Sequence, residues 1–387
     1  RLATSVLGVA VWRVRLEAIA ERAGCPRDDV RALLALRSLD RGADLAEASR
    51  FVGLPRTLRL LWALSRARDV ETMPEPLARE LRAALGDAVF EGFVEASNSA
   101  GPTVLRRPAA LRDEPFSVDG VELVREDGYY VVEGKRCSLR STEAYARGEF
   151  EVMSASSQAC LEATRATANT TVLDACAGNG GKALALADLG ALVTPEDVDE
   201  RKLRQCFGAA KRLGLNFFCD EGRDVFDVVL VDAPCSSSGV LRRHPSLRTQ
   251  LDVLTIDDLA ALQLEILRNA SRRVRPGGTL VYATCSVFPA ENQHVARAFL
   301  ADSSFAPFPF DDEDDTAFRW RPTHLQARWR GLRAPSLEGE SGGAFLRPHE
   351  LLLLPNVHGR VYDGFFIARF RRRRRTTTEG ESSTTAD

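Results

Sequence analysis

The sequence predicts an α/β protein in which an all-helical N-terminal region and a small mixed connector precede a largely parallel sheet. From residue 149 onward, β-rich and helical patterns alternate, and this alternation is typical of parallel strands joined by crossover helices. In the first hundred residues, apolar side chains recur at helical spacing. Near the end, "HELLLLPNV" and "YDGFFIARF" flank His358-Gly359-Arg360, which predicts a hairpin and a last antiparallel strand in the sheet.

The spacing of apolar and turn residues divides the chain into three regions and a tail. Residues 1–96 are expected to form a helical domain, with Leu54, Leu58 and Leu61 on one helix face. Residues 97–148 hold three short extended segments, "TVLRRP", "VELVRED" and "GYYVVEG", and are expected to form a small α+β connector. The main domain is predicted to span 149–372, and 373–387 to be a polar tail.

Within the main domain, the predicted strands and helices follow one another in pairs. Each apolar strand is followed by a longer segment with helical spacing, as expected for βα units. The four pairs are "TVLDA" with "KALALADLG", "ALVTPED" with "DERKLRQCFGAAKRLGL", "DVVLVDAP" with "IDDLAALQLEILRNASRRV", and "TLVYATC" with "ENQHVARAFL". Ligands of such sheets bind at the carboxyl ends of the strands, so functional residues are expected there.

Composition limits the class of protein. Fifty-two Lys and Arg balance 54 Asp and Glu, so net charge neither requires nor excludes a nucleic-acid partner. Eight cysteines without CxxC pairs argue against structural zinc and a secreted disulfide scaffold, and the acidic run 311–315 lacks the spacing of a calcium loop. We therefore expect no metal. With no apolar run long enough to cross a bilayer, we expect a soluble intracellular protein without membrane contact, in the cytoplasm, the nucleolus or a mitochondrion.

A glycine-rich loop follows the first predicted strand. Asp174 closes this strand, and Gly178, Gly180 and Gly181 precede a helix that begins near Lys182. Glycines at such a turn allow the backbone to approach a ligand closely. Asp197, at the end of the next strand, is placed where an acidic group binds ribose hydroxyls. Together these residues predict an adenosine-type cofactor without showing which one.

Two thiols and a carboxylate follow the next two strands. Asp232 and Cys235 come just after "DVVLV", and Cys285 ends "GTLVYATC". A buried, purely structural role is reasonable for either cysteine alone. On adjacent strand ends beside the glycine loop, however, the three side chains are expected to converge on one pocket.

Four motifs, in order, carry a family resemblance: "DACAGNGGK", "VDAPCSSSGVLRRHP", "YATCSVFPAEN" and "DGFFIARF". They resemble the signatures of the NOL1/NOP2/Sun family of RNA cytosine-5 methyltransferases, most closely its bacterial ribosomal-RNA branch with an N-terminal helical domain. The resemblance spans about residues 148–370, including the lead-in "GEFEVMSASSQ". It implies a Rossmann-like class I S-adenosylmethionine-dependent methyltransferase sheet and an RNA substrate, such as ribosomal RNA or a pre-ribosomal particle; protein partners are unknown.

The resemblance also implies roles for individual residues. Cys285 would be the nucleophile that adds to carbon 6 of cytosine, Asp232 would hold or protonate ring nitrogen 3, and Cys235 would assist loss of the carbon 5 proton and product release. S-adenosylmethionine would contact Asp174, Cys176, Ala177, Gly178, Asn179, Gly180, Gly181, Lys182, Asp197, Asp220 and Asp232. Arg242, Arg243 and His244 would approach the RNA phosphate or the flipped base.

The sequence departs from the family pattern at three places and leaves two alternatives open. Gly178-Asn179 stands where the family often has Ala-Pro, the spacer 220–226 is short, and "TVLRRP" has Arg where Asn is frequent. A DNA cytosine methyltransferase is disfavoured because "PCSSS" is followed by a second thiol in "TCS". The other alternative is a non-catalytic RNA-binding ribosome-assembly factor that keeps the fold, against which both intact thiols argue.

Overall fold

The computed structural model describes residues 2–40, 45–65, 73–112, 114–126, 129–133, 138–217, 223–301, 303–310 and 349–374. Predictions about Asp220, the acidic run 311–315 and most of the tail lie outside the described residues. None of the helices in the described part of the chain is long and apolar enough to span a bilayer.

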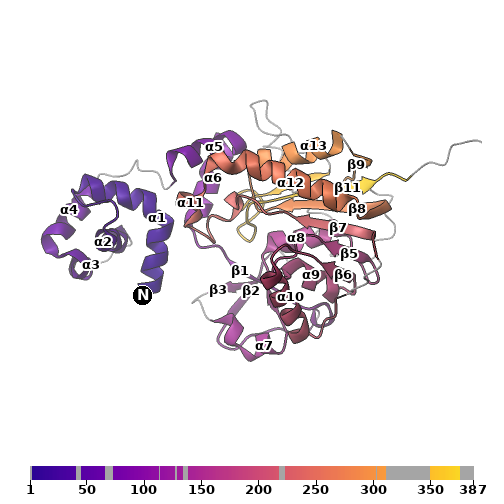
Figure 1. Cartoon of the computed structure of the whole chain (residues 1–387). Helices are drawn as coiled ribbons and strands as arrows, with labels where there is room; N and C mark the ends of the chain where they lie inside the picture. The colour runs from indigo at the N-terminus through magenta and orange to yellow at the C-terminus, as the bar shows by residue number, and fades with distance from the viewer. Residues whose placement is uncertain are drawn as a thin grey trace, which may run out of the picture.

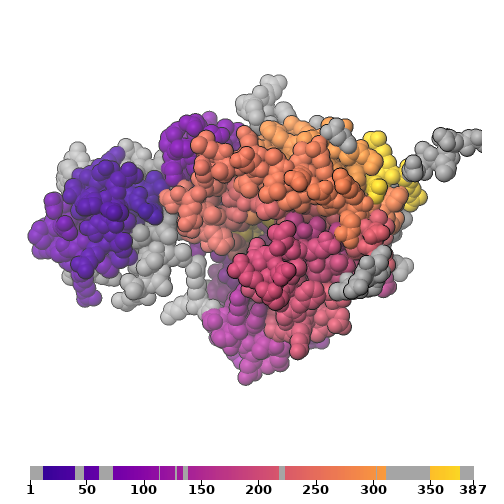
Figure 2. Space-filling model, viewed as in Figure 1, coloured from indigo at the N-terminus to yellow at the C-terminus, as the bar shows by residue number. Residues whose placement is uncertain are grey.

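The first four helices form a lobe with a core of its own (Figures 1 and 2). Leu16 and Ile19 of the first helix, Leu36 of the second and Leu60 of the fourth are buried together. The helices are α1 (Leu2–Arg22), α2 (Val30–Asp40), α3 (Leu45–Val52) and α4 (Leu54–Ser65).

The next two helices, α5 (Glu75–Leu85) and α6 (Asp87–Asn98), pack on the main body instead. Leu81 and Phe93 belong to the same buried cluster as Ile256 and Phe288 of the main domain. The domain boundary near residue 96 stays a prediction, but this shared core means that α5 and α6 cannot be removed without exposing apolar surface.

A four-stranded antiparallel sheet, in the order β2-β3-β1-β4, takes three strands from the predicted connector and its fourth from the first residues of the predicted main domain. The three predicted extended segments are its strands β1 (Thr103–Arg106), β2 (Glu122–Glu126) and β3 (Tyr129–Glu133), and the lead-in motif supplies β4 (Glu151–Val152). One-turn segments are η1 (Ala109–Leu111), η2 (Leu139–Ser141) and α7 (Glu143–Ala146). A buried ion pair of 2.5 Å between Arg106 and Asp188 attaches this sheet to the main domain.

The main sheet has the strand order β10-β11-β8-β7-β5-β6, with β9 also paired to β11. Four strands are parallel to one another: β5 (Thr171–Asp174), β6 (Leu192–Pro195), β7 (Phe226–Asp232) and β8 (Val274–Thr284). The predicted hairpin is confirmed, since β10 (Glu350–Leu353) pairs antiparallel with β11 (Phe365–Arg372), which in turn pairs antiparallel with β8. The remaining strand, β9 (Phe305–Pro307), pairs antiparallel with β11.

Side chains of successive strand residues point to opposite faces, and helices cover both faces (Figure 1). Leu173, Val229 and Leu280 pack in the cluster under α12 (Ile256–Ser271) and α13 (Val295–Ala301). Val172 and Val228 pack in the cluster under α8 (Ala155–Thr164) and α9 (Gly181–Asp188), beside α10 (Glu200–Arg212). Short helical segments complete this domain: η3 (Ser238–Val240), α11 (Leu247–Gln250), η4 (Val253–Thr255) and the π-helix η5 (Ala290–His294).

Candidate active site

The two predicted thiols meet at the carboxyl ends of β7 and β8. The Sγ atoms of Cys235 and Cys285 lie 3.3 Å apart, and both side chains are partly exposed. The backbone N–H of Ala233 continues the pairing of the two strands by donating to the carbonyl of Ala283 at 2.9 Å. This continued pairing fixes the register of the two loops that carry the thiols.

The two thiols titrate in opposite directions. The hydrogen bond with the Cys235 thiol lowers the pKa of Cys285, and the hydrogen bond with the hydroxyl of Ser237, 3.4 Å away, acts in the same direction. The same bond, together with burial, raises the pKa of Cys235 well above its ordinary value. Because a hydrogen bond to the charged form favours that form, these directions make Cys285 the more acidic thiol of the pair and Cys235 the less acidic one.

A buried carboxylate, Glu291, joins the two thiol loops. Its oxygens accept from the Ser236 backbone N–H at 2.8 Å, the Ser236 hydroxyl at 2.5 Å, the Ser286 hydroxyl at 2.5 Å and the Gln263 amide at 2.9 Å. Ser236 follows Cys235 and Ser286 follows Cys285, so one carboxylate positions both neighbours of the thiols. Sequence reasoning missed Glu291 as a functional residue, although it stands in the quoted motif "YATCSVFPAEN".

Glu291 is itself held by its surroundings. It lies in the π-helix η5, and the hydroxyl of Tyr282 donates to its backbone carbonyl at 2.5 Å. Gln263 of α12 also donates to the carbonyl of Pro234, the residue before Cys235. Short π-helical turns are frequent at functional sites, and this one turns Glu291 toward the thiol loops.

The motif "DGFF" packs directly against the loop after Cys235. The N–H of Gly364 donates to the carbonyl of Gly239, whose own N–H donates to the carbonyl of Cys285, each at 2.9 Å. A Cβ placed on Gly239 would lie 2.0 Å from the carbonyl oxygen of Gly364. Both positions therefore require glycine, and this contact accounts for the presence of "DG" in the resemblance.

The three predicted RNA contacts differ in their exposure. Arg242 is 5% exposed and donates to Asp363 at 2.7 Å and to the carbonyl of Tyr362. Arg243 is less buried and bonds the other Asp363 oxygen at 2.5 Å, whereas His244 is exposed. Arg242 is better explained by its ion pair, which fastens the loop to the "DGFF" motif, than by contact with RNA.

The glycine loop has the geometry expected of a cofactor-binding turn. Gly178 and Gly180 have φ of 55° and 88°, in the left-handed region that favours glycine. Asp197 accepts from the N–H groups of Gly178 and Asp199, both at 2.8 Å, one on each carboxylate oxygen. A Cβ on Gly178 or Gly181 would meet nothing within 4 Å, so a ligand can approach the backbone there.

Charged groups beneath this loop are buried close together. Lys182 pairs with Asp232 at 2.5 Å and lies over the ring of Phe365 at 5.2 Å. Burial is the largest single influence on the pKa of Lys182 and lowers it, but Asp232, Cys160 and Asp174 together outweigh burial and raise the pKa. Burial, with repulsion from Asp232, raises the pKa of Asp174 to about 7, and its Oδ1 has no hydrogen-bond partner in the described structure.

These features fit an adenosine-type cofactor. The open loop, the unpartnered oxygen of Asp174 and the Asp197 carboxylate line the same strand ends. Val198, which follows Asp197, is fully exposed and offers an apolar surface for a planar ring. Sequence reasoning missed Val198, whose only signal was its place after the acidic residue. Among the described residues, no cluster of His, Cys, Asp and Glu could hold a metal ion.

The fold and the site define a Rossmann-like methyltransferase. The solved structure of PH0851 matches with a TM-score of 0.69 at 22% identity and covers 95% of this chain and 89% of its own. A methyltransferase homologue from Pyrococcus horikoshii matches with a TM-score of 0.59 at 24% identity (77% of this chain, 95% of that one), and NSun6 from the same organism, solved with SFG, with 0.59 at 17% (77% and 98%). At these identities the likeness concerns the fold.

The chain belongs to the family described as 16S rRNA methyltransferase RsmB/F, whose model matches residues 162–371, more than half of the sequence. It is 34% identical to ribosomal RNA small subunit methyltransferase B of Enterobacter sp. (strain 638), over 60% of this chain and 59% of that protein. It is 38% identical to the same enzyme of Klebsiella pneumoniae (strain 342), over 55% of this chain and 54% of that protein. The matches therefore span between half and two thirds of these relatives. The resemblance to the family is confirmed.

Proposed function

We propose that the chain methylates carbon 5 of cytosine in small-subunit ribosomal RNA through a covalent cysteine–RNA adduct. The observation that carries this proposal is the Cys235–Cys285 pair, whose sulfur atoms lie 3.3 Å apart at the strand ends and whose pKa values are shifted in opposite directions, downward for Cys285 and upward for Cys235. Two thiols of opposite character suit a reaction that needs a nucleophile first and a proton acceptor later.

S-adenosylmethionine is the cofactor that this site suits. Asp197 would accept hydrogen bonds from the ribose hydroxyls of the cofactor, and Val198 would face its adenine. The loop 176–182 would lie along its methionine part. When bound, it supplies a methyl group on a sulfonium, which an electron-rich carbon can attack. Asp174 and Lys182 would lie beneath it, with Lys182 already bonded to Asp232.

The nucleophile in this mechanism is Cys285. Carbon 5 of cytosine is a poor nucleophile until a thiolate adds to carbon 6, which makes carbon 5 an enamine carbon. The lowered pKa of Cys285 keeps a larger fraction ionised at neutral pH than an ordinary thiol with a pKa of about 8.5. The hydroxyl oxygen of Ser237 accepts from the Cys285 thiol in the described structure, and its O–H would rotate to donate to the leaving thiolate when the adduct breaks down.

Asp232 would bind the far side of the pyrimidine ring. Its Oδ2 is bonded to Lys182, and its side chain remains 30% exposed, so the carboxyl group can still contact ring nitrogen 3 and the exocyclic amine. The ammonium of Lys182 fixes the orientation of this carboxyl group. A fixed carboxyl group stabilises the adduct without having to reorganise during the reaction.

Cys235 would act after methyl transfer. The adduct then carries both a hydrogen and a methyl group on carbon 5, and this proton must leave before Cys285 can be expelled. Once Cys285 is bonded to carbon 6, its negative charge is gone and Cys235 no longer donates to it. Cys235, whose side chain is partly exposed, can then give its own proton to water and, as a thiolate, accept the carbon 5 proton. The electron pair of the broken C–H bond re-forms the ring double bond as the Cys285 thiolate departs.

The RNA substrate is proposed from the family and from the enzymes that the chain resembles. Arg243 and His244, next to the thiol loop, remain candidates for phosphate or base contact, and the helical lobe 2–65 is a candidate RNA-binding domain. The predicted domain division 1–96, 97–148 and 149–372 is retained as part of this proposal.

Bisulfite sequencing tests the proposal. Small-subunit ribosomal RNA lacking the modification should acquire one protected cytosine after incubation with the protein and S-adenosylmethionine. The same protein with Cys285→Ala should leave every cytosine convertible. A methyl group incorporated from labelled cofactor without any protected cytosine would show that the target atom is not carbon 5 and would refute the proposal.

A further inference from the structure

We propose that a basic cleft at the amino-terminal ends of the parallel strands, opposite the thiols, is a second RNA-binding site, which binds ribosomal RNA through its phosphates. This inference rests on the proposed RNA substrate. The cleft has a volume of about 790 Å³ and lies where the parallel strands begin, away from the thiols. Thr170 precedes β5, Asp227 lies at the start of β7, and Gly277 and Gly278 lie in the first half of β8.

Positive charge dominates the lining of this cleft. Six arginines line it against one aspartate: Arg165, Arg275, Arg371, Arg372, Arg373 and Arg374 face Asp227. Arg275 already pairs with Asp227 at 2.5 Å. Arg373 and Arg374 are exposed, and within the described part of the chain neither guanidinium has an acidic partner. Such a cluster of positively charged arginine side chains attracts polyanions such as nucleic acids.

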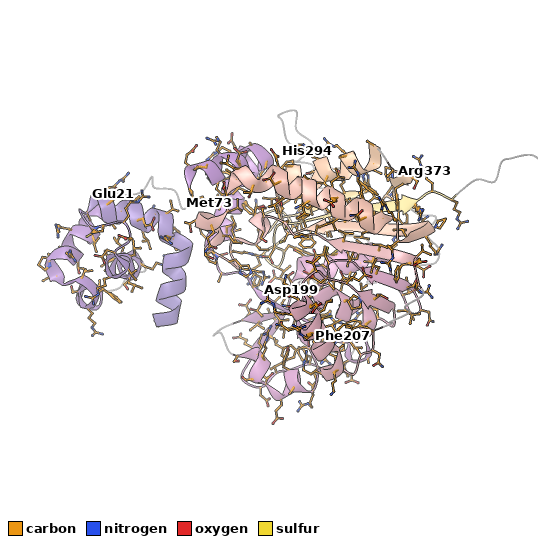
Figure 3. All side chains as sticks on the ribbon, viewed as in Figure 1. Glu21, Met73, Asp199, Phe207, His294 and Arg373 are labelled. Carbon is orange, nitrogen blue, oxygen red and sulfur yellow. The ribbon has the colours of Figure 1, made fainter. Side chains whose placement is uncertain are left out.

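The strand directions explain how the arginines gather here. Because β11 runs antiparallel to β8, its carboxyl end lies where β8 begins, with Arg371 opposite Thr279. Arg371 to Arg374 therefore lie at the end of the strands opposite the thiols, and Figure 3 shows Arg373, which follows β11, well separated from Asp199, which precedes α10. Gly277 has φ of 78° and lacks a side chain, which leaves room for the neighbouring Arg374.

The chemistry of the cleft favours phosphate over a base or an apolar ligand. Phe308, whose ring lines the cleft, is stacked under the guanidinium of Arg371 at 3.8 Å and lies 3.9 Å from that of Arg369. The ring of Phe308 is therefore already covered by guanidinium groups of the protein and is not available to stack on a base. The remaining polar lining includes threonines and Asn169, which can donate hydrogen bonds to phosphate oxygens. Binding should thus be independent of sequence.

The cleft and the thiols are separated by the length of β7. This strand has seven residues, which at about 3.3 Å each place its two ends about 20 Å apart. A short RNA that fills only the catalytic edge would not reach the cleft. An RNA that continues for several more nucleotides could contact both the thiols and the cleft, so the cleft would favour longer RNA segments over isolated target loops.

A double charge reversal tests this inference. R373E/R374E changes two exposed side chains at the end of β11 and leaves the Phe308 stack and the Arg275–Asp227 pair in place. Its affinity for a long small-subunit ribosomal RNA fragment should fall by about tenfold, and the salt dependence should lose about one unit of slope for each phosphate contact removed. Affinity for a stem-loop that holds only the target nucleotide should stay unchanged.

The matched control is R140E/K211E, which makes the same change in net charge at two exposed positions outside the cleft. Equal affinities and slopes for the control and R373E/R374E on the long fragment would overturn the inference. Unchanged RNA binding with a lowered melting temperature would show that the arginines serve the fold, and would also overturn it. Methylation of the stem-loop by both variants reports separately on the proposed function.

Discussion

Replacing Glu291 should loosen both thiol loops at once. This carboxylate is fully buried and accepts four hydrogen bonds of 2.5 to 2.9 Å from Ser236, Ser286 and Gln263. Hydrogen bonds to a charged group contribute about 1.5–3 kcal/mol each, but their effects are not additive, and the native state already includes the cost of burying the charge. Glu291→Gln should therefore lower the free energy of unfolding by about 2 kcal/mol, because the amide keeps the shape and loses the charge. Glu291→Ala, which leaves four donors without an acceptor, should lower it by about 4 kcal/mol.

Urea unfolding measures these changes as shifts in the midpoint at constant slope. Glu265→Gln is the matched control because Glu265 is exposed on α12, and it should change stability by less than about 0.5 kcal/mol. Adduct formation by Glu291→Gln should also slow by about tenfold to a hundredfold, since small misplacements of reacting groups are costly. Equal unfolding midpoints for Glu291→Gln and Glu265→Gln would refute the assigned role of this carboxylate.

Three further predictions concern the cofactor, the thiols and the helical lobe. Asp197→Ala should abolish S-adenosylmethionine binding in calorimetry, whereas Asp197→Asn, which keeps one acceptor, should only weaken it; unchanged affinity in Asp197→Ala would rule out the ribose contact. Alkylation of Cys285 by iodoacetamide should reach half its maximal rate below the ordinary thiol pKa of about 8.5, and Cys235→Ala should move this midpoint to higher pH, because the donor that stabilises the thiolate is lost. A midpoint that stays in place would contradict the pairing. Deleting 1–72 should weaken RNA binding and spare cofactor affinity, whereas deleting 1–96 should also lower the melting temperature, because α5 and α6 share the main core; equal melting temperatures would contradict that packing.

The sequence predicted most of the fold because its signals are local. The alternation of apolar strand-like runs with helical segments located β5, β6, β7 and β8, and the rule that ligands bind at the carboxyl ends of parallel strands placed Asp232, Cys235 and Cys285 together. The C-terminal hairpin was also predictable, since its two apolar runs flank a glycine turn.

What the sequence could not predict depends on tertiary contact. Nothing near Glu291 in the sequence shows that its carboxylate receives a backbone N–H from the loop 55 residues earlier. Arg242 was predicted to contact RNA because it stands in a basic run of the sequence, but the fold buries its side chain against Asp363, 121 residues later. Arg371 to Arg374 of the basic cleft stand together in the sequence, but the antiparallel direction of β11 decides at which end of the parallel strands they lie.

Denaturing electrophoresis of protein–RNA adducts tests the proposed roles of the two thiols most directly. With ribosomal RNA and S-adenosylmethionine, Cys235→Ala should accumulate an adduct that survives denaturation, because Cys285 still adds to the base and the carbon 5 proton is not removed. Cys285→Ala should form no adduct and no methylated product. An adduct in Cys285→Ala but none in Cys235→Ala would reverse the two roles, and unaltered adduct formation in both variants would show that the thiols are structural.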